Sequence, residues 1–176
     1  MNKSDYVSKA LSLSYVPRWS IVDMAKDQSV AEHSYNVTIL SMAIGEIAKR
    51  YGLSFDYGAL LEEALLHDMD EALTGDIPST ITKENIEFES AEQTIIKIAD
   101  RVEALLHIHR YGRNTTNIVE YLTDKLNRWT EILIIEIHKD PPTWINMEEV
   151  SFKIRQELDQ LIHVERAYER AGRNRE

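Results

Sequence analysis

The stretch from Ala64 to Glu71, Ala-Leu-Leu-His-Asp-Met-Asp-Glu, sets the strongest constraint on how this chain can fold. It is an apolar helical run interrupted by the adjacent residues His67 and Asp68, with Glu71 four residues after the histidine. On a helix, His67 and Glu71 lie one turn apart on one face, and Asp68 sits about 100° further round the axis. Buried ionisable groups must be paired, metal-bound or neutralised. A divalent cation would satisfy this requirement, because imidazole and carboxylate together suit transition metals.

The chain has 176 residues, which is enough for one compact domain with a sizeable core. It contains 6 glycines and 4 prolines and no low-complexity or Ser/Gly-rich linker, so we expect a single domain over residues 1–176.

The 30 acidic and 20 basic residues give a net charge of −10. Nucleic-acid-binding domains are usually basic, so this balance argues against binding to a nucleic acid polymer. A small anionic substrate is still compatible, provided that a metal or a few basic side chains make the pocket locally positive.

The absence of cysteine excludes disulfide frameworks, thiolate metal sites and cysteine nucleophiles. Residues 1–5 form no apolar signal region, and no apolar run approaches the length of a membrane span. We therefore expect an intracellular protein, located in the cytoplasm and without a membrane partner.

The dominant periodicity of the chain is helical, and no alternating strand pattern emerges. A capping box at residues 29–32 predicts a helix that starts at about Val30 and ends near Gly52. Asp56 is placed to cap the next helix, which carries the His-Asp pair and stops at residues 74–78. We predict an all-α fold, a bundle of about six helices. Apolar stripes place its other helices at residues 4–14, 95–111, 122–137 and 150–164.

Two further side chains on other predicted helices can join His67 and Asp68. His33 lies one turn into the capped helix, and Asp100 follows an almost wholly apolar stretch, where a carboxylate is costly to bury unless a partner binds it. An isolated helical histidine is more often structural or exposed than a ligand, and Asp100 could equally pair with Arg101. Two imidazoles and two carboxylates would leave open positions on an octahedral or five-coordinate ion for water and a substrate oxygen.

Five blocks of this sequence resemble, in the same order, the bacterial 5′-deoxynucleotidases among the HD-domain metal-dependent phosphohydrolases. They are also similar to the compact phage-type HD hydrolases that act on deoxyadenosine triphosphate. The resemblance covers roughly residues 5–111, and five ordered blocks are specific where a lone His-Asp dipeptide would be weak. The connection between the fourth and fifth blocks is much shorter here than in the 5′-deoxynucleotidases. The blocks are Pro17-Arg18-Trp19, Ser29-Val30-Ala31-Glu32-His33-Ser34, Leu66-His67-Asp68-Met69-Asp70-Glu71, Leu73-Thr74-Gly75-Asp76-Ile77-Pro78 and Ala99-Asp100.

The resemblance implies an HD-domain helical bundle that holds one divalent metal ion, such as cobalt, zinc or manganese. It implies that Glu71 acts on the attacking water and that Asp76 assists at the sugar or as a proton carrier. This agrees with the chemistry, because a metal-bound water has a lowered pKa and a nearby carboxylate can accept its proton as it attacks phosphorus. The implied metal ligands are His33, His67, Asp68 and Asp100.

The same resemblance assigns Arg18 to a phosphate of the substrate and Trp19 to the sugar, where the ring disfavours a 2′-hydroxyl. Trp19 and Ile21 would form an apolar wall for the deoxyribose and base, with Pro78 on the other side. Lys83 is a candidate for a terminal phosphate. Without the resemblance, Trp19 and Ile21 are better explained as core residues, and an ordinary solvated lysine explains Lys83 at least as well.

We therefore expect metal-dependent hydrolysis of the 5′-phosphoester of deoxynucleotides, which releases the deoxynucleoside together with phosphate or triphosphate. The compact length favours a phage-type triphosphatase, whereas a small site set by Trp19 can also accept a monophosphate. One alternative is a cyclic-nucleotide phosphodiesterase, which would usually want further metal-ligand histidines. Another is a non-catalytic helical module that binds a nucleotide or a protein.

We also expect a homo-oligomeric contact through the last two helices. The histidines outside the ligand group are expected to be structural or exposed: His107, His109, His138 and His163.

Overall fold

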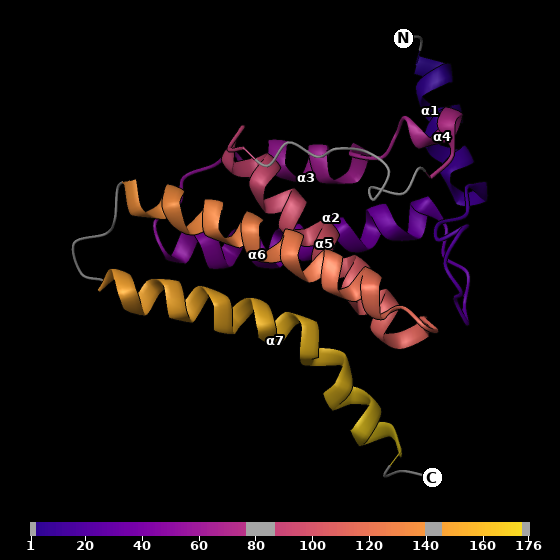
Figure 1. Ribbon diagram of the computed structural model, residues 1–176. Helices are drawn as coiled ribbons and strands as arrows, with labels where there is room; N and C mark the ends of the chain where they lie inside the picture. Colours follow the sequence, from indigo (N-terminus) through magenta and orange to yellow (C-terminus); the bar gives the residue numbers. More distant parts are fainter. Residues whose placement is uncertain (1–2, 77–86, 140–145, 174–176) are drawn as a thin grey trace.

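The computed structural model describes residues 3–76, 87–139 and 146–173 (Figure 1). Six helices of ten residues or more and one single-turn helix lie in these ranges, which contain no β-sheet. The predicted all-α bundle of about six helices is therefore confirmed. In chain order the helices are α1 (Lys3–Ser12), a 3-10 helix (Leu13–Tyr15), α2 (Val30–Arg50), α3 (Tyr57–Leu66), α4 (Glu71–Thr74), α5 (Ala91–Tyr111), α6 (Thr116–Lys139) and α7 (Met147–Arg173).

Helix α5 is the central element of the bundle, because it packs against α2, α3, α6 and α7. In Figure 1, α3 lies on one side of the α2–α5 pair and α7 lies on the other. Apolar side chains at three- and four-residue spacing along α5 form the core stripe that these helices cover. Each of them is at most 2% exposed: Ile95, Ile98, Val102, Leu105 and Ile108. None of the helices in the described ranges is both long enough and apolar enough to span a membrane.

Helix α2 begins where the capping box predicts. The Ser29 hydroxyl accepts a hydrogen bond from the Glu32 backbone N–H at 3.2 Å, and the Glu32 carboxylate accepts one from the Ser29 N–H at 2.8 Å. The cap fixes the direction of the first turn, which carries the fully buried His33. The helix ends at Arg50, and Gly52 follows with a φ of 98° that a glycine adopts without strain.

Capping side chains also set the starts of α3, α5 and α7. Asp56 accepts from the Ala59 N–H at 2.9 Å, as predicted. Ser90 accepts from the Gln93 N–H at 3.0 Å, so α5 begins at Ala91, one turn before the apolar stripe from which its start was predicted. Asn146 accepts from a backbone N–H of the first turn of α7 at 3.1 Å.

The expectation of one continuous helix through the His-Asp pair and Glu71 is wrong. Helix α3 ends at Leu66, residues 67–70 form turns, and Glu71 opens α4. The Met69 N–H donates to the Leu66 carbonyl and the Glu71 N–H donates to the Asp68 carbonyl, both at 3.0 Å. Bonds between residues three apart wind the backbone more tightly than an α-helix does. His67 and Glu71 therefore do not share one face of a helix.

This turn explains how two neighbouring side chains serve one site. In a straight α-helix, consecutive side chains diverge by about 100° and cannot both point at the same neighbour. In the turn, His67 and Asp68 both approach His33 of α2. The local departure from helical geometry therefore accompanies the convergence of these residues on one point.

Candidate metal and substrate site

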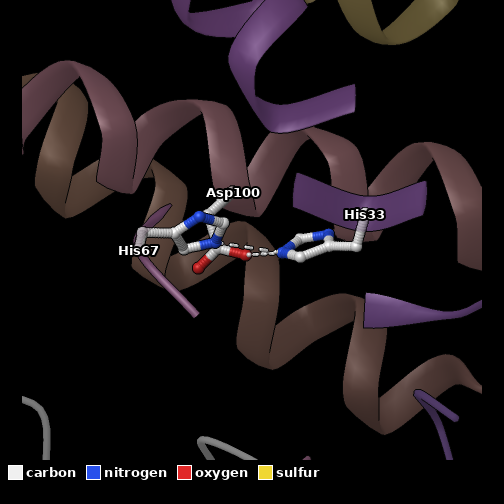
Figure 2. A group of neighbouring side chains, drawn as sticks. All are labelled: His33, His67 and Asp100. Carbon is white, nitrogen blue, oxygen red and sulfur yellow. Dashed lines mark hydrogen bonds and ion pairs between the residues drawn. The ribbon is translucent and has the colours of Figure 1, made fainter. Parts of the chain in front are cut away.

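Three elements of the bundle, α2, the end of α3 and α5, bring ligand atoms together. Figure 2 shows His33 of α2, His67 from the end of α3 and Asp100 of α5 with their polar ends turned toward one another. One ligand atom from each side chain lies within 4.8 Å of the others. The His33 Nε2 atom is 3.3 Å from His67 Nε2 and 3.3 Å from Asp100 Oδ1. The prediction of a side-chain group that can bind a metal ion is thus confirmed.

Asp68 joins this group from the turn after α3. Its Oδ2 atom lies 3.1 Å from His67 Nε2 and 3.4 Å from His33 Nε2. Burial would raise the pKa of Asp68, but hydrogen bonds with the two histidines hold it well below its usual range. Burial likewise opposes ionisation of Asp100, whose pKa is nevertheless lowered by the charges of Arg101 and His33. All four predicted ligands therefore lie together, and both carboxylates are anionic.

Glu103, one helical turn after Asp100 on α5, fixes the orientation of His33. Its Oε2 atom lies 2.7 Å from His33 Nδ1, and the side chain is nearly inaccessible. Burial would raise the pKa of Glu103, but the hydrogen bond and charge of His33 lower it to about 2. An ionised carboxylate accepts the Nδ1 proton, so the Nε2 atom of His33 faces the ligand group. Glu103 was not among the predicted site residues, although its spacing from Asp100 on an apolar helix was a usable signal.

His67 is oriented in the same way by the backbone. Its Nδ1 atom donates to the Ala64 carbonyl at 2.8 Å, which leaves Nε2 toward His33. Burial and Arg18 would lower the pKa of His33, but three hydrogen-bonded carboxylates raise it to about 10 in the metal-free protein. A cation at this point would replace that proton, and two imidazoles with two carboxylates suit zinc, cobalt or manganese. The three carboxylates are those of Asp100, Asp68 and Glu103.

Glu71 offers a carboxyl group beside the ligands. Its Oε2 atom is buried and has no hydrogen-bond partner among the described residues. Burial, together with the negative charges of Asp68 and Asp76, raises the pKa of Glu71 to about 8. Such a group exchanges a proton readily near neutral pH, which suits a general acid or base.

Arg18 presents unsatisfied donors in the same region. Its Nε and Nη1 atoms are buried and lack hydrogen-bond partners in the described part of the chain. The guanidinium carbon lies 5.3 Å from the centre of the Trp19 ring. Buried donors are normally satisfied, and an anionic group of a ligand would satisfy a guanidinium best. The positive charge of this side chain contributes to the lowered pKa values of Asp100 and Glu103 and opposes the rise in the pKa of Glu71.

Trp19 is held at both its backbone and its ring. Its φ of 64° is unfavourable for a side chain of this size by about 1–2 kcal/mol. The backbone N–H donates to Asp76 Oδ2 at 3.0 Å, and the indole Nε1–H donates to Gln28 Oε1 at 3.0 Å. The ring also stacks on His107, with ring centres 6.1 Å apart and planes 2° apart. Strained residues held this firmly are typical of ligand sites.

The structure does not place the other three predicted substrate-binding residues, Ile21, Pro78 and Lys83, against the ligand group. Ile21 is 68% exposed, so it is a surface residue and not part of the core. Pro78 and Lys83 lie outside the described residues. His107 is buried against Trp19, whereas the remaining histidines outside the ligand group are exposed: His109, His138 and His163.

Comparison with known families decides what kind of protein has this arrangement. Residues 5–102 match the family described as 5′-deoxynucleotidase YfbR-like. The chain belongs to the YfbR-like family. A 5′-deoxynucleotidase of Klebsiella pneumoniae is 26% identical over 134 residues, which cover 68% of this chain and 67% of that protein. A 5′-deoxynucleotidase of Pectobacterium atrosepticum is 32% identical over 104 residues, which cover 57% of this chain and 51% of that protein.

Solved structures show the same fold. The cyanophage S-2L HD phosphohydrolase, bound to dA and one catalytic Zn²⁺ ion, matches 87% of this YfbR-like chain and 96% of its own chain. Its TM-score is 0.63 at 20% identity. An HD-domain phosphohydrolase of Listeria innocua has a TM-score of 0.56 at 22% identity, and the match covers 90% of this chain and 88% of that one. The predicted resemblance to HD-domain phosphohydrolases is confirmed.

Proposed function

We propose that this YfbR-like chain hydrolyses the 5′-phosphoester of deoxynucleotides at one divalent cation. The observation that carries the proposal is the convergence of two imidazole Nε2 atoms with two ionised carboxylates from three elements. The names of its family and relatives, which are 5′-deoxynucleotidases, support the reaction. The proposed metal ligands are His33, His67, Asp68 and Asp100.

The described side chains divide the chemistry among them. A bound cation would supply Lewis-acid chemistry at the phosphoryl group. Glu71 would take a proton from the water that attacks phosphorus, because its Oε2 atom has no hydrogen-bond partner in the described part of the chain. As the bond between phosphorus and the 5′-oxygen breaks, that oxygen needs a proton, which Glu71 can return directly or through Asp76 as a carrier. Arg18 would pair with the equatorial phosphate oxygens, where negative charge gathers.

Trp19 would select the sugar. Its ring cannot retreat from a 2′-hydroxyl, because its backbone and its indole nitrogen are both anchored. Ile21, exposed beside it in sequence, would extend the apolar wall toward the base. We assign the other wall to Pro78 and a distal phosphate to Lys83.

The product released together with the deoxynucleoside can be phosphate or triphosphate. The names of the curated relatives favour a deoxynucleoside monophosphate. The cyanophage neighbour is described as bound to dA, which supports an adenine deoxynucleoside as product without fixing the number of phosphates. We keep deoxyadenosine triphosphate as a second candidate because the compact length resembles the phage-type hydrolases. Release of phosphate or triphosphate distinguishes these two substrates directly.

The test is product analysis on mono- and triphosphates of deoxy- and ribonucleosides, before and after removal of metal. We expect deoxynucleoside to be released, activity to be lost on chelation and restored by zinc, cobalt or manganese, and ribonucleotides to be poor substrates. Cleavage of cyclic nucleotides alone would indicate a phosphodiesterase. A native protein that binds nucleotide but is inert and metal-free would indicate a non-catalytic module. Equal cleavage of ribonucleotides would contradict the role of Trp19.

We also propose that the protein acts as a homo-oligomer in the cytoplasm, where deoxynucleotides are found. Exposed apolar side chains on three helices support self-association. Tyr35, Ile39 and Met42 share one face of α2 and are 63%, 47% and 37% exposed. Ile135 of α6 and Phe152 of α7 are 55% and 66% exposed. The mass in solution, measured by light scattering, tests this proposal, and a monomer at micromolar concentration would contradict it.

A further inference from the structure

A continuous path of hydrogen bonds joins Trp19 to the proposed metal ligand His33. The Trp19 indole N–H donates to Gln28 Oε1 at 3.0 Å, and Gln28 Nε2 donates to Glu103 Oε1 at 2.6 Å. The other carboxylate oxygen of Glu103 accepts from His33 Nδ1 at 2.7 Å. Gln28 and Glu103 are 4% and 3% exposed, so water does not compete for these bonds.

The chemistry of the neighbours fixes the orientation of the Gln28 amide. An indole nitrogen only donates, and an ionised carboxylate only accepts. The amide oxygen must therefore face Trp19 and the amide nitrogen must face Glu103. If the amide rotated, both of its contacts would become repulsive at once, so this one orientation is strongly favoured.

The backbone of Gln28 reinforces this link. The Arg18 N–H donates to the Gln28 carbonyl at 2.8 Å, and Pro17 and Ser29 form an antiparallel bridge beside it. Gln28 thus holds the backbone of Arg18, the indole of Trp19 and the carboxylate that orients His33. Residues 16–29, the segment between the 3-10 helix and α2, make no other described hydrogen bond with Glu103.

We propose that Gln28 is a positioning residue that couples the sugar-selecting ring of Trp19 to the metal ligand His33. The inference rests on the proposed function, in which His33 holds the cation. Its consequence is reciprocal, as coupling between two sites must be. Loss of the bond to Trp19 weakens cation binding, and cation binding alters the surroundings of the Trp19 ring.

The first test measures zinc affinity by calorimetry on metal-stripped protein. The variant Gln28→Leu removes both side-chain bonds at similar volume, and we expect its affinity to fall by about tenfold to a hundredfold. Trp19→Phe removes the indole donor and keeps a smaller aromatic ring against His107, and we expect a smaller loss of a few-fold. Asn36→Ala is the matched control, because Asn36 Nδ2 donates to the same Glu103 oxygen at 3.1 Å without contacting Trp19.

Two further readouts separate coupling from a merely structural role. Zinc should change the emission of Trp19, obtained as the difference between wild type and Trp19→Phe, and this change should vanish in Gln28→Leu. The ratio of kcat/KM for deoxy- over ribonucleotides should fall in Gln28→Leu and stay unchanged in Asn36→Ala. If Gln28→Leu does not fold, as judged by circular dichroism, Trp19→Phe alone decides through its zinc affinity.

Unchanged zinc affinity in both Gln28→Leu and Trp19→Phe would overturn the coupling. An equal loss in Gln28→Leu and Asn36→Ala, with none in Trp19→Phe, would also overturn it, because Glu103 alone would then explain the effect. With either result the wild-type protein would still bind zinc and hydrolyse deoxynucleotides, so the proposed function would stand. Failure of the proposed function would differ, because the wild-type protein would then bind no zinc or cut no deoxynucleotide.

Discussion

At the scale of single residues, Glu71 has a buried carboxyl oxygen with no hydrogen-bond partner among residues 3–76, 87–139 and 146–173, and its pKa is raised to about 8. Glu71→Gln keeps the shape of the side chain and removes its ability to accept a proton. We expect turnover to fall by about 10²–10⁴-fold while zinc affinity changes little. Steady-state kinetics and calorimetry on the same preparation measure the two effects.

Asp70→Asn is the matched control for Glu71→Gln. Asp70 is the preceding acidic residue, is exposed and forms no side-chain hydrogen bond at the start of α4. Removing its charge should leave turnover nearly unchanged. Near-full turnover of Glu71→Gln with zinc bound would show that Glu71 is not the base.

The pKa of His33 gives a second prediction at this scale. Its value of about 10 means that the metal-free imidazole is protonated at neutral pH. A cation binds only the unprotonated Nε2, so binding must release about one proton, and affinity should rise about tenfold per pH unit below the pKa. Calorimetry in buffers of different ionisation enthalpy between pH 6.5 and 7.5 counts the released protons.

Glu103→Gln supplies the control for this proton count. It removes one of the carboxylates that raise the pKa of His33, so the pH above which zinc binding no longer releases a proton should be lower than in the wild type. A wild-type protein that binds zinc without releasing a proton would contradict the protonated state assigned to His33.

The sequence predicted site residues that stand out from their own neighbours in the chain. It did not predict residues that matter only through contacts with distant parts of the chain. His33, His67, Asp68 and Asp100 stand out because ionisable groups interrupt apolar helices. Gln28 and Glu103 have no such signal as a pair. They are 75 positions apart and meet only after α2 has packed against α5.

At the scale of elements, the capping box of α2 determines where His33 lies. Both of its reciprocal bonds are formed, so Ser29→Ala should lower the free energy of unfolding by about 1 kcal/mol. Urea denaturation measures the change. Ser54→Ala, at an exposed loop position, is the control and should have little effect. An unchanged stability of Ser29→Ala would mean that packing alone fixes the start of α2.

The elements also show why local patterns predict helix starts better than helix ends. Capping depends on residues three apart, so Ser29 and Asp56 could be recognised from the sequence. The end of α3 depends on a site built with two other helices. Nothing in residues 64–71 alone distinguishes a turn from one more turn of helix, and the expectation of a continuous helix failed there.

At the scale of the whole molecule, the proposed cation would join α2, the turn after α3 and α5, which are far apart in sequence and adjacent in space. The assembled site exists only in the folded chain, so zinc should bind the folded state and stabilise it. At a free zinc concentration 100 times the dissociation constant, the gain should be about 2.7 kcal/mol. Zinc should raise the midpoint temperature of thermal unfolding by several degrees, which unfolding curves recorded with and without a chelator measure. His67→Ala removes one ligand without touching the core, so its midpoint should respond far less to zinc; an equal response would place the stabilising ion elsewhere.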